Sequence, residues 1–343
     1  MKDIEKLIVR FTESEGDYAD YLFRLKAILK DILDLHECSY QSIEGRVKTK
    51  ESLRNKLSNL NVKKVSEVQD LVGVRVITYV YKDVEKIEQI LNKHFVCKEL
   101  KVEERLGTDR VGYRSRHWLI SLSPERLKLP EYQRFAEFKA ELQIRTILQH
   151  AWAQIGHNQV YKPSSILPDR IKRDFLLLSG LLEIADNEFG RISKEISKYQ
   201  SNVKLKAEKG DLQIPLDTIS IREYFDSHFK ALVESPTFGP QDDMAEEIID
   251  ELKRMDITTL EELDRLNTDD VREEVTTNAY PETNYTGAAR SLMILSNADK
   301  YFSKAWRKKW TMGVGSLKQY EKYNKNISSI VKKYNVKIDA NIY

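Results

Sequence analysis

Two carboxylates lie in short hydrophobic segments of this chain. Glu141 opens the segment ELQIRT (141–146), and Asp70 opens the segment DLVGVR (70–75). A charge in such surroundings is costly unless it is paired or binds a cation. Mg²⁺ prefers oxygen ligands and usually takes one or two protein carboxylates, with phosphate and water completing its shell. The two residues therefore predict a divalent metal site, and the alternative is that Glu141 forms an ion pair with an arginine such as Arg145.

A stepped row of cations precedes the first carboxylate. Lys48, Ser52 and Lys56 are spaced four residues apart, so they are expected on one face of a helix predicted over 49–58. Arg46 precedes them in a predicted loop. A helix N-terminus with lysines along its ridge suits a polyphosphate. The alternative is a solvated basic face. Together with the two carboxylates, the row indicates phosphoryl or pyrophosphoryl transfer.

Alternation along the two hydrophobic segments restricts how these residues can meet. Gln143 and Arg145 follow Glu141 with a period of two, so the three side chains project from one face of a strand. The same rule places Asp70 and Arg75 on opposite faces. Either Asp70 lies just before its strand, or Arg75 flanks the site from an edge.

The segment GYRSRH (112–117) could supply a second binding surface. If it is extended, Tyr113 and His117 share a face, where a ring can stack on a base and an imidazole can meet phosphate or ribose. The alternative is an ordinary strand with a half-buried tyrosine. On the helix that follows ELQIRT, Trp152 is expected in the core, and His157 is either structural or part of the site.

The elements that position these residues alternate between strands and helices. Helical spacing covers residues 14–36, 49–58, 84–91 and 146–161, and strand-like segments cover 72–80, 95–103, 114–122 and 138–144. Pro163 and Pro168 end the last of these helices, and 169–199 is expected as one long helix or a bent pair. Strands alternating with helices, followed by helices alone, predict an α+β catalytic domain with a mainly helical C-terminal extension.

Composition excludes several classes of protein. The chain has 343 residues, which is enough for two domains. Its net charge of +2 does not by itself point to nucleic acid or membrane. The longest apolar stretch, 175–185, is far shorter than the roughly 20 residues of a membrane span. No secretory signal opens the chain, so we expect a cytoplasmic location. Cys38 and Cys97 are expected as isolated thiols.

The order of the motifs resembles the synthetase domain of RelA/SpoT-type alarmone synthetases, in particular the short, single-function kind. The matching motifs are Arg-x-Lys-x-x-x-Ser-x-x-x-Lys at 46–56, Asp-x-x-x-x-Arg at 70–75, Gly-Tyr-x-Ser-x-His at 112–117, Glu-x-Gln-Ile-Arg-Thr at 141–146 and Ala-Trp-Ala-x-x-x-His-x-x-x-Tyr-Lys at 151–162. The resemblance implies a nucleotidyltransferase-like mixed β-sheet flanked by helices in a domain spanning 1–200. Residues 205–343 are then a mainly helical domain with a regulatory or oligomerising role, and a homo-oligomer is implied.

The resemblance implies transfer of the β,γ-pyrophosphate of ATP to the ribose 3′-hydroxyl of GDP or GTP, with Mg²⁺ as cofactor and AMP as the second product. Asp70 and Glu141 are the implied catalytic residues and metal ligands, and Glu141 also takes the proton of the attacking hydroxyl. The implied ATP-binding residues are Arg46, Lys48, Ser52, Lys56 and Arg75. The implied acceptor-binding residues are Arg110, Tyr113, His117, Gln143 and His157.

Two positions depart from the family pattern. Asp109 replaces a lysine that usually meets acceptor phosphates, with Arg110 next to it, and Gly156 replaces a glutamate. Both changes concern the acceptor side, whereas the ATP side is intact. One alternative is therefore a toxic relative that pyrophosphorylates the tRNA 3′ end or an adenosine nucleotide, which the basic, aromatic stretch after residue 300 would suit. A second alternative is a non-catalytic module that senses nucleotide or binds a partner. No His-Asp hydrolase pair occurs, so synthesis without hydrolysis is expected.

Overall fold

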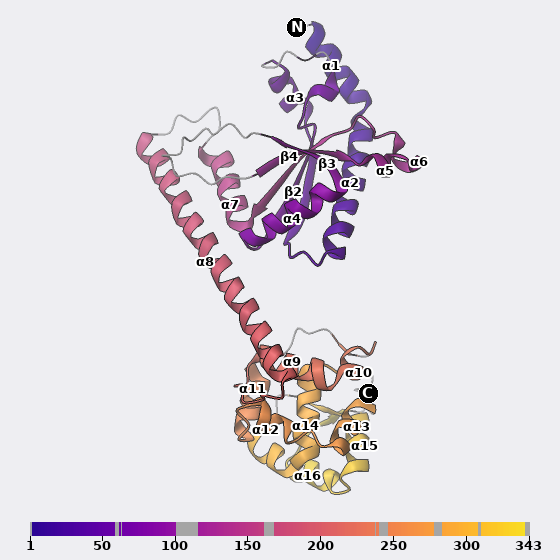
Figure 1. Ribbon diagram of the computed structural model, residues 1–343, viewed down its shortest axis with the longest axis vertical. Coiled ribbons are helices and arrows are strands. Elements are labelled where there is room, and N and C mark those ends of the chain that lie inside the picture. The colour runs from indigo at the N-terminus through magenta and orange to yellow at the C-terminus, as the bar shows by residue number, and fades with distance from the viewer. Residues whose placement is uncertain are drawn as a thin grey trace. The chain divides into compact units, whose positions relative to one another are not determined.

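A computed structural model of the chain describes residues 2–58, 62, 64–100, 116–160, 168–236, 238–239, 246–277, 283–307 and 310–339 (Figure 1). The chain divides into two compact units, Met1–Lys194 and Glu195–Tyr343. The first unit combines a β-sheet with helices, and the second is mainly helical. The α+β fold with a mainly helical C-terminal region, predicted from the sequence, is confirmed.

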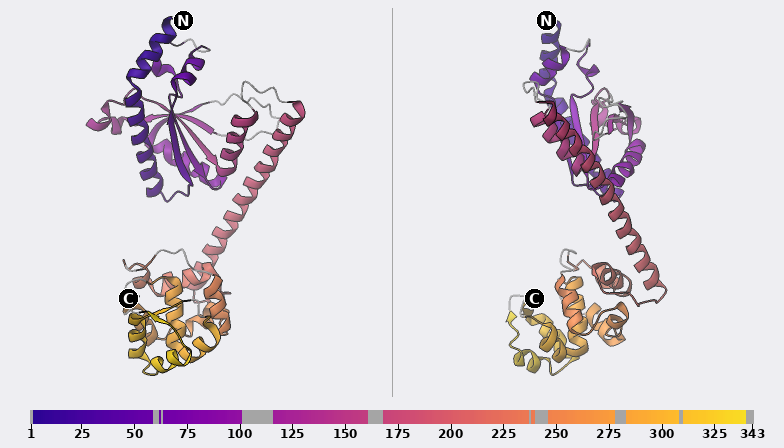
Figure 2. Two further views of the ribbon diagram at one scale, coloured as in Figure 1. Left: turned by 180° about the vertical axis from the view of Figure 1, so that it is seen from behind. Right: turned by 90° about the vertical axis from the view of Figure 1, so that its left-hand side faces the viewer.

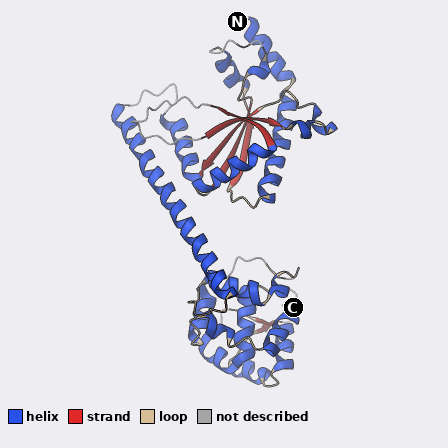
Figure 3. Cartoon of the chain, viewed as in Figure 1, coloured by secondary structure: helices blue, strands red, loops and turns tan. Residues whose placement is uncertain are grey.

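The first unit is built on a five-stranded mixed sheet with the strand order β1-β2-β5-β4-β3 (Figure 3). The strands are β1 (Ser42–Val47), β2 (Val72–Thr78), β3 (Phe95–Leu100), β4 (Arg116–Leu122) and β5 (Ala140–Thr146). Strands β2 and β5 run parallel, and the other neighbouring pairs run antiparallel. The parallel pair lies at the centre, so the segments that carry Asp70 and Glu141 become neighbours.

Alternation gives the sheet an apolar face and a polar face. Along the first part of β2 and of β5, buried side chains alternate with half-buried ones. The buried positions Val74, Val76, Leu142 and Ile144 join side chains of the helices α2 (Glu15–Leu35) and α4 (Tyr81–His94) in one hydrophobic core. The side chains between them, which include Arg75, Glu141 and Gln143, lie on the opposite side, called here the polar face.

Helices surround this sheet and connect its strands (Figure 2). They are α1 (Lys2–Glu13), α2 (Glu15–Leu35), α3 (Lys50–Leu57), η1 (Val65–Glu67), α4 (Tyr81–His94), α5 (Pro124–Leu127), α6 (Pro130–Gln133) and α7 (Ile147–Ile155). Helix α3 begins where the Thr49 side chain accepts a hydrogen bond from the backbone of Ser52. Helix α7 begins at a capping box formed by Thr146 and Gln149, directly after β5.

Two predictions about elements differ from the structure. The helix expected over 146–161 ends at Ile155, and a short π-helix, η2 (Gly156–Val160), follows, where Gly156 has a low helix propensity. The segment that contains Arg46 forms strand β1 instead of the predicted loop. Of the two forms expected for 169–199, the structure shows one long helix, α8 (Asp169–Glu208).

The second unit packs short helices around α14 (Tyr285–Lys300). The others are α9 (Thr218–His228), α10 (Lys230–Val233), α11 (Glu246–Arg254), α12 (Leu260–Asp264), α13 (Asp269–Thr277), η3 (Tyr301–Ala305), α15 (Val314–Tyr323) and α16 (Ile327–Lys333). Strands β6 (Met312–Gly313) and β7 (Ile338–Asp339) form a small parallel pair. In the described ranges, no helix combines the length and the apolar composition needed to cross a bilayer.

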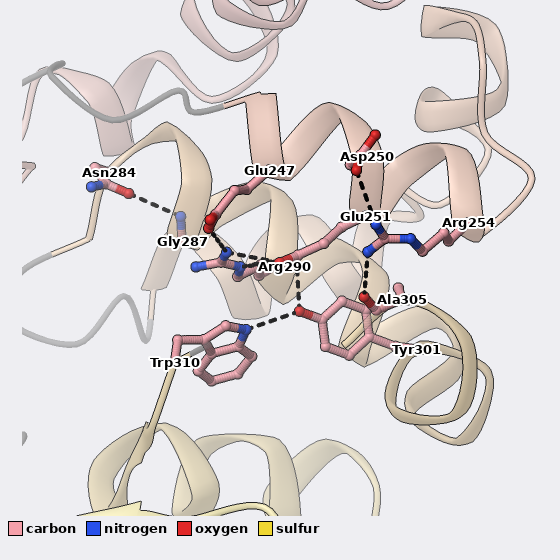
Figure 4. Close-up of polar contacts among 10 residues, drawn as sticks. All are labelled: Glu247, Asp250, Glu251, Arg254, Asn284, Gly287, Arg290, Tyr301, Ala305 and Trp310. Atoms are coloured by element: carbon pink, nitrogen blue, oxygen red, sulfur yellow. Dashed lines mark hydrogen bonds and ion pairs between the residues drawn. The ribbon is translucent and has the colours of Figure 1, made fainter. Parts of the chain in front are cut away.

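A buried polar network ties the helices of the second unit together (Figure 4). Glu251 of α11 accepts hydrogen bonds from Arg290 Nη2 at 2.8 Å and from the Tyr301 hydroxyl at 2.8 Å. Trp310 Nε1 donates to the same hydroxyl at 3.2 Å, and Arg290 lies over the Trp310 ring. Because each charged group has a partner, the network fixes the positions of α11, α14 and η3 instead of leaving a buried charge unpaired.

Candidate active site

The sheet register places the predicted site residues in two adjacent rows on the polar face. One row runs across four strands, with Glu44 of β1 opposite Arg75 of β2, Arg75 opposite Gln143 of β5, and Gln143 opposite His117 of β4. In the next row, Gly73 of β2 lies opposite Arg46 of β1 on one side and Glu141 of β5 on the other. Residues that are far apart in the sequence thus meet on one surface.

Asp70 lies just before β2 rather than within it, which resolves its relation to Arg75. Lys48 Nζ lies 2.7 Å and Lys56 Nζ lies 2.8 Å from the same carboxylate oxygen, Asp70 Oδ2. The other oxygen, Oδ1, is buried and has no hydrogen-bond partner among the described residues. Burial by itself would raise the pKa of Asp70, but the hydrogen bonds from Lys48 and Lys56 outweigh it and lower the pKa.

The cation row has a different geometry from the predicted one. Lys48 lies before α3, so it does not share a helix face with Ser52 and Lys56. Instead, the two lysines reach Asp70 from separate elements, and the side chain of Lys48 is only 15 % exposed. Ser52 is exposed, and its hydroxyl accepts a hydrogen bond from Thr49 at 2.9 Å. The lysines are therefore not simply a solvated basic face, because both are directed at a carboxylate.

Two side chains contact the same oxygen of Glu141. His117 Nδ1 lies 2.9 Å from Glu141 Oε1, and Gln143 Nε2 donates to the same oxygen at 2.7 Å. The contact with His117 is the largest cause that lowers the pKa of Glu141, to about 2, against the opposite effect of burial. The alternative partner proposed from the sequence, Arg145, instead lies with Nη2 3.4 Å from His117 Nε2. Burial, with a smaller effect of Arg75, lowers the pKa of Arg145 to about 10.

The two arginines expected on the ATP side lie close to each other at the same end of the sheet. Arg46 is an exposed residue of β1, and Arg75 is a half-buried residue of β2. Burial is the main cause that lowers the pKa of Arg75, and the charge of Arg46 lowers it further. Arg75 Nε also donates to Gln143 Oε1 at 3.2 Å. A cationic rim therefore borders the two carboxylates.

A cavity of about 200 Å³ joins these groups. It is lined by Glu44, Gly45, Arg46, Lys48, Asp70, Gly73, Val74, Arg75, Glu141 and Gln143. Asp70 and Glu141 thus face one shared space, which a joint role in metal binding requires. Glu44 and Gly73 also line the cavity but are not predicted as site positions from the sequence. Their alternation with Arg46 and Arg75 along the two strands is the signal that would have found them.

Part of the predicted acceptor side lies outside the described residues. This holds for Arg110, Tyr113 and the departure at Asp109. His117 is described and contacts Glu141, as given above. His157 is an exposed residue of η2, and within the described part of the chain it is not among the residues that line the cavity.

The two carboxylates are chemically suited to a divalent cation. Asp70 uses Oδ2 for the lysines, and its buried oxygen Oδ1 has no partner in the described part of the chain, while the donors to Glu141 described above converge on Oε1. Each acid can therefore offer one oxygen to an ion without giving up its protein contacts. No group of three or more acidic, histidine or cysteine residues suited to a metal occurs in the described ranges. Substrate oxygens and water would thus have to complete the shell, as is usual for Mg²⁺.

Comparison with known proteins places the chain in a family. Residues 45–165 match the model of a region found in RelA / SpoT proteins. GTP pyrophosphokinase YwaC of Bacillus subtilis is 30% identical over 159 residues, which cover 45% of this chain and 73% of that protein. GTP pyrophosphokinase YjbM of the same organism is 26% identical over 207 residues, covering 57% of this chain and 94% of that protein. Among solved structures, small alarmone synthetase 1 from Bacillus subtilis aligns with a TM-score of 0.44 at 22% identity, over 55% of this chain and 98% of that one.

The matched region contains both carboxylates, both lysines and the strands that carry the polar face, and the identity to YwaC extends over most of that protein. The chain therefore belongs to the RelA/SpoT family of alarmone synthetases.

Proposed function

We propose that this protein is a Mg²⁺-dependent GTP pyrophosphokinase. It transfers the β,γ-pyrophosphate of ATP to the ribose 3′-hydroxyl of GDP or GTP, making (p)ppGpp and AMP. The observation that carries the proposal is the shared cavity in which Asp70 and Glu141 lie next to Lys48, Arg46 and Arg75. The two GTP pyrophosphokinases among its relatives add support.

On the donor side, the chain's own residues bind and position ATP. Arg46 and Arg75 flank the adenine from neighbouring strands, and Lys48 and Lys56 exchange Asp70 for phosphate oxygens, with Ser52 beside them. Cations held in place before the reaction stabilise charge on the phosphates without reorganisation of solvent. Lys48 and Lys56 already meet at one point, so little side-chain entropy is lost when a phosphate replaces the carboxylate oxygen.

Asp70 and Glu141 would hold the Mg²⁺ ion, which neutralises charge on the transferred phosphates when bound. The acceptor's 3′-oxygen attacks the β-phosphorus of ATP, the bond between the β-phosphorus and the bridging oxygen to the α-phosphate breaks, and AMP leaves. The proton of the 3′-hydroxyl passes to Glu141. His117, whose Nδ1 lies 2.9 Å from Glu141 Oε1, would contact the acceptor beside this carboxylate.

The acceptor side is completed by Tyr113, stacking on the base, together with Arg110, Gln143 and His157. The departures at Asp109 and Gly156 favour a second candidate function on this side, in which the tRNA 3′ end or an adenosine nucleotide is the acceptor. Both functions use the same donor chemistry.

We further propose that residues 1–200 form the synthetase domain, that residues 205–343 serve self-association or regulation, and that the protein acts in the cytoplasm as a homo-oligomer.

Product analysis tests the proposed function directly. The protein is incubated with Mg²⁺ and γ-labelled ATP, with GDP, GTP, AMP, ADP or tRNA as acceptor, and the products are separated by chromatography. We expect label on GDP or GTP, with AMP formed in equal amount. Label on tRNA or an adenosine nucleotide but never on a guanosine nucleotide would replace the first acceptor with the second. A wild-type protein that transfers no label but still binds ATP would favour the non-catalytic module.

The substitution Glu141→Gln tests the catalytic role within the same assay. We expect turnover to fall by about 10²- to 10⁴-fold, since the base and one metal ligand are lost, while ATP binding measured by calorimetry without Mg²⁺ stays within about threefold. Glu131→Gln, at an exposed position of α6, is the matched control and should leave turnover unchanged. Unchanged turnover in Glu141→Gln would remove this residue from the mechanism.

A further inference from the structure

Gln143 lies at the centre of a hydrogen-bond chain that connects the donor side of the site to the acceptor side. Arg75 Nε donates to Gln143 Oε1 at 3.2 Å, and Gln143 Nε2 donates to Glu141 Oε1 at 2.7 Å. His117 Nδ1 reaches the same Glu141 oxygen at 2.9 Å. The strands hold the members of this chain in register, because Gln143 lies directly opposite Arg75 on one side and His117 on the other.

The chemistry of the partners fixes how the Gln143 amide is turned. A guanidinium can only donate, and an ionised carboxylate can only accept. The amide oxygen must therefore face Arg75 and the amide nitrogen must face Glu141, so this orientation follows from the partners themselves. A glutamate of the same length would place a second carboxylate against Glu141, and an apolar side chain would bridge neither partner. Both ends of the amide are thus already engaged within the protein.

We propose that Gln143 is a positioning residue that couples Arg75 to Glu141, an inference that rests on the proposed function. By holding Oε1, the amide orients the carboxylate so that Oε2 is left for the metal and the attacking hydroxyl. When Arg75 contacts the adenine of ATP, the Gln143 amide transmits the position of Arg75 to Glu141, the carboxylate that must accept the proton. Gln143 then acts through Glu141, in addition to any contact with the acceptor.

A double-mutant cycle with Glu141 separates this role from a simple binding role. The variants are Gln143→Met, which keeps the length but makes no hydrogen bond, and Gln143→Glu, which can only accept. Each is made in the wild-type protein and in Glu141→Gln, and turnover is measured with excess enzyme so that slow variants remain measurable. Gln89→Met, at an exposed position of α4, is the matched control. Thermal unfolding of every variant checks that it is folded.

We expect Gln143→Met to lower kcat by about ten- to a hundredfold, since the hydrogen bond that it removes is charge-assisted, while the KM for ATP stays within about threefold. Gln143→Glu should lower kcat further, and Gln143→Asn should retain part of it. In the Glu141→Gln background, Gln143→Met should cause little additional loss. Full additivity of the two losses, or a higher KM for the acceptor with unchanged kcat, would overturn the positioning role.

A metal-binding measurement keeps the inference testable apart from turnover. Mn²⁺ binding to the protein with a non-hydrolysable ATP analogue is followed by electron paramagnetic resonance. We expect Gln143→Met to weaken Mn²⁺ binding about tenfold, because Glu141 is no longer held, whereas Gln89→Met should not change it. Unchanged Mn²⁺ affinity would overturn the inference even if the acceptor proves not to be a guanosine nucleotide. A wild-type protein that transfers no pyrophosphate would instead contradict the proposed function.

Discussion

At the scale of single residues, the two carboxylates of the site are held in a similar way. Among the described residues, the ion pairs of Asp70 meet at Oδ2 and the contacts of Glu141 meet at Oε1, and Asp70 Oδ1 is buried there without a partner. Such a group is costly in a folded protein unless a ligand satisfies it. Lys48 and Lys56 offset the charge of Asp70 through ion pairs with Oδ2. In the proposed function, phosphate oxygens of the substrate would replace these internal ion pairs.

The substitution Asp70→Asn should distinguish the contribution of the metal ion to ATP binding from that of Lys48 and Lys56. We expect turnover to fall by at least about a hundredfold, as for the loss of a preorganised electrostatic group. ATP binding without Mg²⁺ should be unchanged or tighter, because Lys48 and Lys56 no longer pair with a carboxylate, and the gain in affinity on adding Mg²⁺ should shrink. Calorimetry with and without Mg²⁺ measures both effects, with Asp31→Asn on the exposed side of α2 as control. A full Mg²⁺ response in Asp70→Asn would exclude Asp70 as a ligand.

At the scale of elements, the site depends on the edge strand β1, on the inner strands β2 and β5, and on the open space above their polar face. Gly73 lies between Arg46 and Glu141 in the register, at a position where any other residue would place a side chain in the cavity. A Cβ built there would meet nothing closer than the Arg46 carbonyl oxygen, at 3.9 Å. Packing within the protein therefore tolerates a methyl group at this position, and the space that it would fill belongs to the cavity.

The substitution Gly73→Ala should therefore weaken ATP binding without lowering the stability of the protein. We expect stability to be unchanged or higher by up to about 1 kcal/mol, since alanine restricts the unfolded chain, while ATP binding weakens. Gly73→Val should weaken ATP binding further. Thermal unfolding and calorimetry measure the two effects. Gly190→Ala, on α8, where nothing lies within 4 Å of the added Cβ, should leave ATP binding unchanged. ATP affinity in Gly73→Val equal to that of the wild-type protein would show that substrate does not occupy this part of the cavity.

At the scale of the whole molecule, one side of α8 packs against the first unit, and large apolar side chains elsewhere on this helix are exposed. Within the first unit, Phe175 stacks on Trp152 of α7 at 5.0 Å, and Asp186 accepts a hydrogen bond from the Thr146 hydroxyl at 2.6 Å. Large apolar side chains remain exposed elsewhere along the same part of the helix, at Ile171, Leu177, Leu178, Leu181, Ile184, Phe189 and Ile192. Leu178, Leu182, Ala185, Phe189 and Ile192 are also spaced alternately by four and three residues, the repeat by which like helices pair.

We expect this exposed surface of α8 to pair with the same surface of a second copy of the chain. The double substitution Leu178→Glu with Phe189→Glu should then reduce the assembly size by at least a factor of two, since a charge in an apolar contact between helices is costly. Sedimentation velocity measures the size. Lys194→Glu, an exposed polar position on the same helix, is the control for added charge. A wild-type protein that sediments as a monomer, or a double variant with unchanged size, would rule out this pairing.

Much of the site could be predicted from local order in the sequence. A period of two places Glu141 and Gln143 on one strand face whatever the neighbours are, and the spacing of polar residues and prolines marks helices and their ends. The α+β class likewise follows from the succession of patterns. The order of motifs was specific enough to identify the family, because several chemically unusual segments had to occur in one sequence. Each pattern and each motif is recognised within a few residues, and the fold class and family need only their order along the chain, not the contacts between them.

Only the tertiary structure decided which groups meet. Strand β1 has little hydrophobic alternation of its own and forms because it pairs with β2, so Arg46 and Glu44 enter the site through a contact that no local pattern contains. The convergence of Lys48 and Lys56 on Asp70, and the contact of Glu141 with His117 rather than Arg145, likewise join distant segments. Strand pairing and side-chain contacts are set by the packing of the whole unit, and the sequence near each residue does not carry that information.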